Sequence, residues 1–478
     1  MSRNSIGINK MSKVAALLMA LTLILTACST GEQPSMDAGA AAESLAPLLP
    51  KTLLTLDDFL YDFDNLIKTM NENYPNFGVV ERRFGLDINE HAAKVRTMIE
   101  NYPESLRDRA YEAGLAFEDM PVLNEHVFWS ILYGEFFQPF NRIGRTHVWT
   151  FTRYFATSGI SGVSSPSVFY SAQKDLFERL AVESPELFRF IFRCDPSEAH
   201  IIASEYEVIH PIITTDILEE NQIAYMNLRS LMQPGGLGSY TNQALEFYES
   251  IQGYAHLIID IRECGGGQVI TWSREIMNPL WPDRASVPKL HLFAFFRGNQ
   301  SAFWHGEMFF SGLVDDLEWI PASESLLSIE EILESNDMPH FNEDDLLDFG
   351  YGFEYIFDLS GSKPEKSSAL YEAYYPFKGR IWLLTSSNNW SGSAVFANYA
   401  KALGFATLVG DTVEGVQTLG ANNVHILERC GITVQWDMDY TTDEHGRAIE
   451  EFPTTPHYFN REGMDALETT LSLINEGS

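Results

Sequence analysis

The chain has few cysteines for its length. Its 478 residues include four, at positions 28, 194, 264 and 430, and none of them stands in a CxxC or zinc-binding spacing. Cys28 belongs to an N-terminal signal, which leaves three cysteines, so a framework of paired disulfides is not indicated. No histidines form an HExxH motif either. We therefore predict no metal site and no cofactor.

Positive charge is also scarce. Lysine and arginine total 32 against 66 aspartates and glutamates, which gives a formal net charge of −34. A protein of this charge repels the phosphates of nucleic acid and the head groups of anionic lipid. Nucleic acid is therefore not an expected partner, and electrostatic attraction to a membrane is not expected.

The N-terminus nevertheless carries a lipoprotein signal. Basic residues within the first thirteen positions precede an apolar stretch, 14–25, that is too short for an ordinary membrane-spanning helix. A small residue, Ala27, stands before Cys28, which suits removal of residues 1–27 and lipidation of Cys28. Acyl chains would anchor the protein in the bacterial cell envelope from the extracytoplasmic side, at the inner or the outer membrane. A cleaved secretory peptide without lipid is the alternative.

Beyond the signal, the patterns predict an α/β protein with a helical N-terminal domain. Residues 28–50, rich in Ala, Ser, Gly and Pro, are expected to form a flexible tether. Apolar residues then recur at helical spacing across 51–150, and a helical linker region with an amphipathic helix at 168–192 is expected within 151–220. Across 221–478 strands alternate with helices, which is typical of a parallel sheet covered by helices on both faces.

An acidic and aromatic insertion interrupts this core at about 290–377. Its centre reads EEILESNDMPHFNEDDLLDFGYGFEYIFD. Acidic residues in such a run usually form a solvated helix face, which we favour over a cation site. The insertion is also a candidate for a wall or lid over a cleft.

Two segments of the core combine a buried strand with an unusual turn. In HLIIDIRECGGG (256–267), three glycines would let the backbone approach a ligand and direct its N–H groups toward it. In the segment 379–404 an apolar strand leads into a helix with Ser391 near its first turn. A hydroxyl there faces unpaired N–H groups and the positive helix end, so Ser391 is a candidate nucleophile, or alternatively only an N-cap.

Together these segments resemble the two signature stretches of the C-terminal processing peptidases, the serine peptidase family that includes the tail-specific proteases and the tricorn core. Asp260, Arg262, Gly266 and Gly267 stand at the family's positions in the first stretch. In the second, Phe396-Ala397 and the strand end at 410–415 set the register. That register implies that Ser391 is the nucleophile, with Ser386, Ser387 and Ser393 as bystanders.

The resemblance runs from about Leu56 to the C-terminus, with two unmatched regions, and implies a ClpP/crotonase-like core. Many family members carry a PDZ domain, but no pattern of that kind is recognisable in 151–220. Ala394 replaces the glutamate that usually follows three residues after the nucleophile. We expect that this replacement affects packing more than chemistry.

The resemblance also indicates which base the enzyme uses. Val416 follows Gly415 where the Ser-Lys branch has a lysine, which excludes that branch for an active enzyme. The tricorn-like branch has a histidine after a hydroxyl residue, and Thr146-His147 match this pair with Thr in place of the usual Ser. The family's glutamate near the C-terminus matches Glu450, six residues before Pro456.

These matches imply a Ser-His-Glu arrangement. His147 would take the proton from Ser391 and return it to the leaving amine, while Glu450, helped by the Thr146 hydroxyl, orients the imidazole. Backbone N–H groups of Gly266 and Gly392 would form the oxyanion hole.

Each of these residues has a plainer interpretation. Taken alone, His147 is typical of a hydrogen-bonded core histidine, and Glu450 competes with Glu451 for its role. Cys264, beside the glycines, is expected to pack as a small buried residue and not to act as a nucleophile.

The sequence thus predicts a membrane-anchored, extracytoplasmic serine endopeptidase that acts on peptides or unfolded proteins through an acyl-enzyme. A catalytically inactive relative that binds an apolar or peptide ligand is the main alternative. An esterase is the second.

Overall fold

The computed structural model describes residues 53–140, 148–150, 176, 179–193, 195–197, 213–231, 241–297, 327–345, 348–359, 374–418 and 422–477. The predictions for the signal, Cys28 and the tether lie outside these residues, as do those for Thr146 and His147. Most of the region 151–220, where no PDZ domain was recognisable, also lies outside them.

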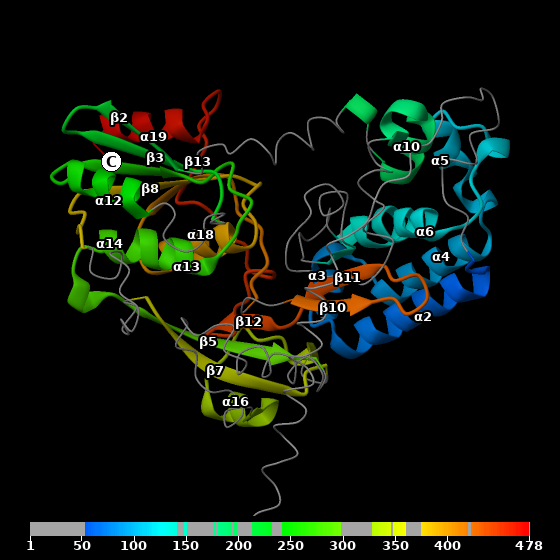
Figure 1. Cartoon of the computed structure of the whole chain (residues 1–478). Coiled ribbons are helices and arrows are strands. Elements are labelled where there is room, and N and C mark those ends of the chain that lie inside the picture. The colour runs from blue at the N-terminus through cyan, green and yellow to red at the C-terminus, as the bar shows by residue number, and fades with distance from the viewer. Residues whose placement is uncertain are drawn as a thin grey trace, which may run out of the picture. The chain divides into compact units, whose positions relative to one another are not determined.

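A six-stranded, mostly parallel sheet forms the centre of the α/β core (Figure 1). Its order is β13-β9-β8-β4-β3-β2, and only the pair formed by β2 and β3 is antiparallel. The strands are β2 (Ile213–Glu219), β3 (Ile223–Leu228), β4 (His256–Asp260), β8 (Arg380–Thr385), β9 (Thr407–Gly410) and β13 (Tyr458–Phe459). The parallel sheet predicted from the alternation of strands and helices is therefore confirmed.

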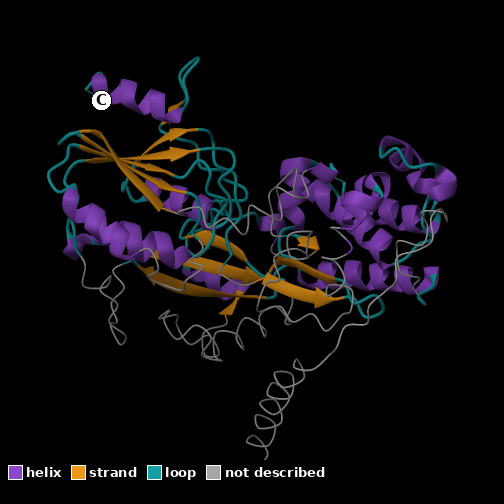
Figure 2. Cartoon of the chain, turned by 45° about the horizontal axis from the view of Figure 1, so that its top comes forward, coloured by secondary structure: helices purple, strands orange, loops and turns teal. Residues whose placement is uncertain are grey.

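The central strands read as continuous apolar runs because both of their faces are buried. Ile258 of β4 and Trp382 of β8 pack on one face, in a cluster with the C-terminal helix α19 (Ala466–Asn475). Leu257 and Leu383 belong to the larger cluster on the other face. Figure 2 shows helices on both sides of this sheet, with α19 at the end marked C.

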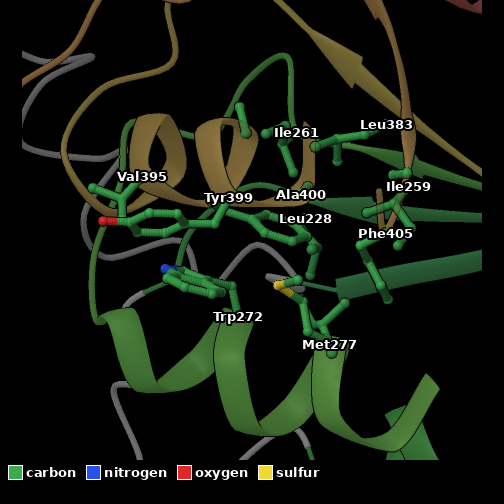
Figure 3. Packing of buried hydrophobic residues seen from close by; sticks show 14 of the residues in the cluster. Leu228, Ile259, Ile261, Trp272, Met277, Leu383, Val395, Tyr399, Ala400 and Phe405 are labelled. Carbon is green, nitrogen blue, oxygen red and sulfur yellow. The ribbon is translucent and has the colours of Figure 1, made fainter. Parts of the chain in front are cut away.

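The larger cluster is built with helices that follow the strands. It includes side chains of α12 (Thr241–Ser250), α13 (Val269–Trp272) and α18 (Gly392–Ala402). The chain continues from α13 through a π-helical turn, η5 (Ser273–Met277), into α14 (Asn278–Leu280) and a 3-10 turn, η6 (Arg284–Ser286). In Figure 3, Trp272 and Met277 reach from α13 and η5 toward Tyr399 and Ala400 of α18. The Trp272 ring stacks on Phe396 at 5.7 Å, so α18 is fixed against α13 by aromatic packing.

Much of the predicted acidic insertion belongs to a second sheet. Its order is β12-β5-β7-β6 and all its pairs are antiparallel. The strands are β5 (Lys289–Phe296), β6 (Leu327–Ser328), β7 (Tyr351–Asp358) and β12 (Tyr440–Asp443). Between β6 and β7 lie α16 (Ile329–Ser335) and the 3-10 turn η8 (Glu343–Asp345).

The acidic residues of the insertion thus have two environments. Glu330 and Glu331 lie on the exposed side of α16, as expected for a solvated helix face, while Ile329 and Ile332 are buried. The segment YGFEYIFD instead forms β7, because its aromatic and β-branched residues pair along β5. No group of His, Cys, Asp and Glu suited to a metal ion is present within the described residues.

The N-terminal domain is helical, as predicted. Its helices are α2 (Leu56–Asn73), α3 (Phe77–Phe84), α4 (Ile88–Glu100), α5 (Arg107–Glu112) and α6 (Glu125–Ile131), with short turns η2 (Glu104–Leu106), η3 (Phe117–Asp119) and η4 (Leu132–Phe137). Thr55 and Asp58 form a capping box at the start of α2. Phe59, Phe63 and Leu66 recur at helical spacing in α2 and are buried.

The sequence predicted one continuous amphipathic helix at 168–192, and this prediction is wrong because the helix is interrupted at Ser184. Residues 179–183 are helical, Ser184 is not, and α10 (Pro185–Phe192) starts anew at Pro185. Proline lacks the N–H that a continuing helix needs and its ring clashes with the preceding turn, whereas it is well suited to the first helical position.

A three-stranded sheet packs against the helical domain. β11 (Thr433–Asp437) lies between β1 (Trp149–Thr150) and β10 (Asn422–Ile426), and both pairings are antiparallel. β10 and β11 therefore form a hairpin. Val434 and Trp436 of β11 belong to the same apolar cluster as the helices.

None of the helices described is both long and apolar enough to span a bilayer.

Candidate active site

Ser391 lies at the junction between the central sheet and α18. β8 ends at Thr385, a turn follows, and the helix starts at Gly392. The backbone of Ser391 has φ 52° and ψ −130°, and its side chain makes no capping hydrogen bond to the helix. A positive φ costs a residue with a β-carbon about 1–3 kcal/mol, and such strain is found preferentially at functional sites. Ser391 is thus the N-cap residue of α18 by position, but its hydroxyl does not cap the helix.

The glycine-rich turn after β4 runs against this junction. A β-carbon at Gly266, where φ is +115°, would lie 2.5 Å from the Trp390 carbonyl oxygen and 3.0 Å from Ser391 Cβ. A β-carbon at Gly392 would lie 2.3 Å from the carbonyl oxygen of Gly267. These distances leave no room for a side chain at either position. The two predicted oxyanion-hole residues, Gly266 and Gly392, are thus brought together beside Ser391.

Polar side chains in the turn before α18 hold the glycine-rich turn after β4 in place. Ser386 Oγ donates to the Arg262 carbonyl at 2.6 Å, and the Asn389 side-chain amide donates to the carbonyls of Ile261 and Cys264. Ser393 Oγ donates to the Cys264 carbonyl at 2.7 Å. The hydroxyls of Ser386 and Ser393 are therefore used to fix the turn.

Asp260 and Arg262 stabilise the fold at the end of β4. The buried Asp260 carboxylate accepts hydrogen bonds from the Arg262 guanidinium, at 2.7 Å for Nη2, and from the Tyr225 hydroxyl. Arg262 Nη1 also donates to Asp465, the residue that caps α19. Burial and the bond to Asp260 raise the pKa of Tyr225 to about 12. This network ties the end of β4 to the C-terminal helix.

Glu450 is buried, and its two carboxyl oxygens have different surroundings. Oε1 accepts a hydrogen bond from the Gln417 backbone N–H at 2.6 Å, whereas Oε2 has no hydrogen-bond partner within the described parts of the chain. Burial holds the pKa of Glu450 well above its ordinary value, and the nearby Asp437 and Asp439 raise that pKa further. Such a carboxyl is stabilised in its ionised form when a cation, for example an imidazolium, lies beside it.

Gln417 links this carboxyl to the helix that follows Ser391, a connection not predicted from the sequence. Its backbone binds Glu450, and its side-chain amide donates to the Tyr399 hydroxyl of α18 at 2.7 Å. Gly415, two residues earlier, packs so closely on Ala394 of α18 that a β-carbon would lie 2.3 Å from Ala394 Cβ. Ala394 therefore packs directly against the segment that leads to Gln417.

Cys264 has the properties of a packing residue. It is fully buried, and its Sγ contacts the Gly266 carbonyl at 3.9 Å. Burial raises the pKa of the Cys264 thiol, which disfavours the thiolate that a cysteine nucleophile needs.

The predicted base, His147, and its neighbour Thr146 lie outside the described residues. The chain is described again from Val148, which is buried, and β1 follows at Trp149. β1 pairs with β11, the strand that ends at Asp437, one of the carboxylates that raise the Glu450 pKa.

Comparison with known proteins gives a family for part of the chain. Residues 341–459, which include Ser391, Gln417 and Glu450, match the model of peptidase family S41. The match begins inside the region predicted as an insertion. No curated protein matches the chain.

Three solved structures are among those found in the comparison. A peptidase structure from Parabacteroides merdae is 15% identical, with a TM-score of 0.44 over 87% of this chain and 96% of its own. A lipoprotein from Streptococcus agalactiae is 11% identical, with a TM-score of 0.40 over 90% and 100%. Mature CPAF complexed with lactacystin is 11% identical, with a TM-score of 0.46 over 84% and 94%.

Proposed function

We propose that this chain, whose residues 341–459 belong to peptidase family S41, is an extracytoplasmic serine endopeptidase held at a bacterial membrane by lipid on Cys28. The match to this family supports a serine peptidase with peptide or protein substrates. The proposal adds the catalytic residues, the acyl-enzyme route and the anchor.

In the proposed reaction, Ser391 Oγ attacks the carbonyl carbon of the scissile bond while His147 accepts the hydroxyl proton. Backbone N–H groups of Gly266 and Gly392 stabilise the oxyanion that forms. Collapse of the intermediate breaks the C–N bond, and His147 returns the proton to the leaving amine. Water, deprotonated by His147, then hydrolyses the acyl-enzyme and regenerates the Ser391 hydroxyl.

The observation that carries this proposal is the strained Ser391 backbone lying against the Gly266-Gly267 turn. A nucleophile elbow needs a hydroxyl raised on a sharp strand-to-helix turn, with backbone donors beside it. The buried Glu450 adds support, because one of its carboxyl oxygens has no hydrogen-bond partner among the described residues and the carboxylate of such an arrangement has to bind an imidazole.

Hydrolysis of an unfolded protein by the full chain tests the reaction. We expect Ser391→Ala and His147→Ala each to lower kcat by about 10³-fold or more, and Glu450→Gln by about 10²-fold or more, with each variant still folded. Equal activity in wild type and Ser391→Ala would contradict the proposal and would favour the ligand-binding alternative. Turnover of esters without turnover of peptides would favour an esterase.

Membrane association tests the anchor separately. We expect the wild-type chain to sediment with membranes and Cys28→Ala to appear in the soluble fraction. Retention of Cys28→Ala on the membrane would contradict lipidation at this residue.

A further inference from the structure

Two consecutive arginines at the end of α3 contact the segment that carries Glu450. Arg82 forms a bidentate pair with Asp345, with N–O distances of 2.8 and 2.7 Å, and also donates from Nε to Glu451 at 2.8 Å. Arg83 donates from Nη1 to the backbone carbonyl of Glu450, and its Nη2 lies 3.5 Å from Glu414 Oε1. α3 therefore holds this segment although more than 360 residues separate Arg83 from Glu450.

The contacts of Arg83 lie on both sides of the hydrogen bond that holds the Glu450 carboxyl. Glu414 stands three residues before Gln417, whose N–H binds Glu450 Oε1 at 2.6 Å. The Arg83 guanidinium thus contacts both partners of this bond: the segment 414–417, which supplies the donor, and the main chain of Glu450, which supplies the acceptor. The planar guanidinium can serve two acceptors at fixed separation, which a lysine ammonium on a flexible stem cannot do equally well.

The position of the Glu450 carboxyl depends on these two segments staying together. Within the described residues, the Gln417 N–H is its one hydrogen-bond donor from another residue. A shift of the 414–417 segment by about 1 Å would lengthen that bond beyond the normal range. Displacements of this size at a catalytic group typically cost about 10²-fold in rate.

We infer that Arg83 is a positioning residue for the acid of the active site: by bridging Glu414 and the Glu450 carbonyl, it keeps Glu450 Oε1 on the Gln417 N–H and Oε2 available to orient the base. This inference rests on the proposed function. It makes the helical domain part of the catalytic apparatus, because α3 supplies the bridging residue.

Steady-state hydrolysis of a fluorogenic peptide by the full chain provides the first test. Arg83→Gln should lower kcat by about 10–100-fold with KM changed by less than about twofold, and Arg83→Lys should restore part of the loss. The matched control is Arg96→Gln, on the outer side of α4, where Arg96 pairs with Asp64 and Glu100. Urea unfolding of each variant separates a loss of fold from a loss of position.

A double variant distinguishes positioning from general structural damage. If Arg83 acts through Glu450, then Arg83→Gln/Glu450→Gln should be no slower than Glu450→Gln alone. Two results would overturn the inference and leave the proposed function intact. One is a double variant whose loss of kcat is the product of the losses of the two single variants. The other is an Arg83→Gln variant whose kcat equals that of the wild type. Equal activity in wild type and Ser391→Ala would instead overturn the proposed function.

An infrared measurement tests the inference without turnover. The acid C=O band of Glu450, assigned by its loss in Glu450→Gln, reports its protonation as pH is raised. The charged and titratable groups around this carboxyl are Arg83 and the side chains Asp437, Asp439, Tyr399 and Tyr440. Arg83→Gln should lengthen the Gln417 N–H bond, which favours the ionised carboxyl, and should remove a nearby cation, so the pH at which the band is lost should rise. An unchanged or lowered midpoint would contradict the bridge.

Discussion

At the scale of single residues, the site depends on backbone conformations that ordinary residues avoid. Ser391, with φ 52°, is one of three non-glycine residues with positive φ within the described ranges, and the others are Arg193 and Asn221. Gly266 and Gly267 have φ of 115° and 129° beside it. The packing of Phe396 and the hydrogen bonds of Asn389 and Ser393 hold this arrangement against its conformational cost.

Gly266→Ala tests whether the close approach of the two turns is required. The new β-carbon would meet the Trp390 carbonyl, so we expect unfolding free energy to fall by about 1–3 kcal/mol and kcat by about 10²-fold or more. Urea unfolding and peptide hydrolysis measure these effects. Two controls have no described atom within 4 Å of the new β-carbon. Gly253→Ala, at φ +92°, controls for backbone strain, and Gly265→Ala controls for the change of residue. A Gly266→Ala variant as stable and active as Gly265→Ala would contradict the account.

Glu450 should make stability depend on pH. Because its folded pKa is raised, the folded chain keeps a proton at pH values where the unfolded chain has released it. The free energy of unfolding therefore falls as pH rises from the ordinary carboxyl pKa toward the raised one, by up to about 1.4 kcal/mol per pH unit. Glu450→Gln cannot ionise, so its stability should decline less over this interval.

Urea unfolding at a series of pH values measures this difference. Glu334→Gln, an exposed position of α16, is the matched control and should follow the wild type. Parallel pH curves for wild type and Glu450→Gln would show that Glu450 has no raised pKa.

The sequence pointed to residues that stand in a recognisable local pattern. It missed residues that matter only through contacts with distant parts of the chain. Ser391 stands where an apolar strand is followed by a helical pattern, and the three consecutive glycines indicate that the backbone approaches another group closely. Gln417 and Arg83 carry no such pattern. Their roles arise from contacts with Glu450 across 33 and 367 positions, which only the fold creates.

At the scale of elements, buried strands were the most predictable feature. β4 and β8 lie in the two segments, 256–267 and 379–404, where the sequence predicted buried strands, because a strand buried on both faces is a continuous apolar run. β7 was not predicted as a strand, since its segment is acidic and aromatic and gains its order by pairing with β5. Strand pairing between distant segments leaves little trace in either segment alone.

The link between β4 and α19 gives a prediction at this scale. Arg262→Gln would leave the buried Asp260 carboxylate without its cationic partner and α19 without the contact at its cap. We expect unfolding free energy to fall by about 1–3 kcal/mol, below the value for a fully buried pair because Arg262 is partly exposed.

The matched control is Arg461→Gln, which breaks an exposed pair with Glu476 of the same helical region. It should change stability little, since exposed ion pairs are screened by water. Equal effects of the two substitutions in urea unfolding would contradict a structural role for Asp260 and Arg262.

At the scale of the whole molecule, the helical domain is joined to late segments of the chain. The buried Asp62 of α2 accepts hydrogen bonds from the backbone N–H groups of Arg429, at 3.0 Å, and Cys430, at 2.8 Å, in the turn between β10 and β11. Trp436 and Val434 of the hairpin share an apolar cluster with the helices. The sequence predicted the helices but not their contacts with the hairpin formed by β10 and β11.

Asp62→Ala tests this union. Two N–H groups, of which that of Cys430 is buried, would lose their acceptor, so we expect unfolding free energy to fall by about 1–3 kcal/mol and the amides of Arg429 and Cys430 to exchange hydrogen faster. Asp62→Asn keeps one acceptor oxygen and should lose less. Unchanged exchange at both amides in Asp62→Ala would show that α2 does not hold the turn.

The central claim is that Ser391 is a nucleophile activated by distant parts of the same chain. Treatment of the full chain with a fluorophosphonate, followed by mass spectrometry of its peptides, tests this claim most directly. We predict one adduct, on Ser391, that is absent from Ser391→Ala and lost or strongly slowed in His147→Ala. Labelling of Ser386, Ser387 or Ser393 in its place, or no labelling of folded wild-type protein, would contradict the account.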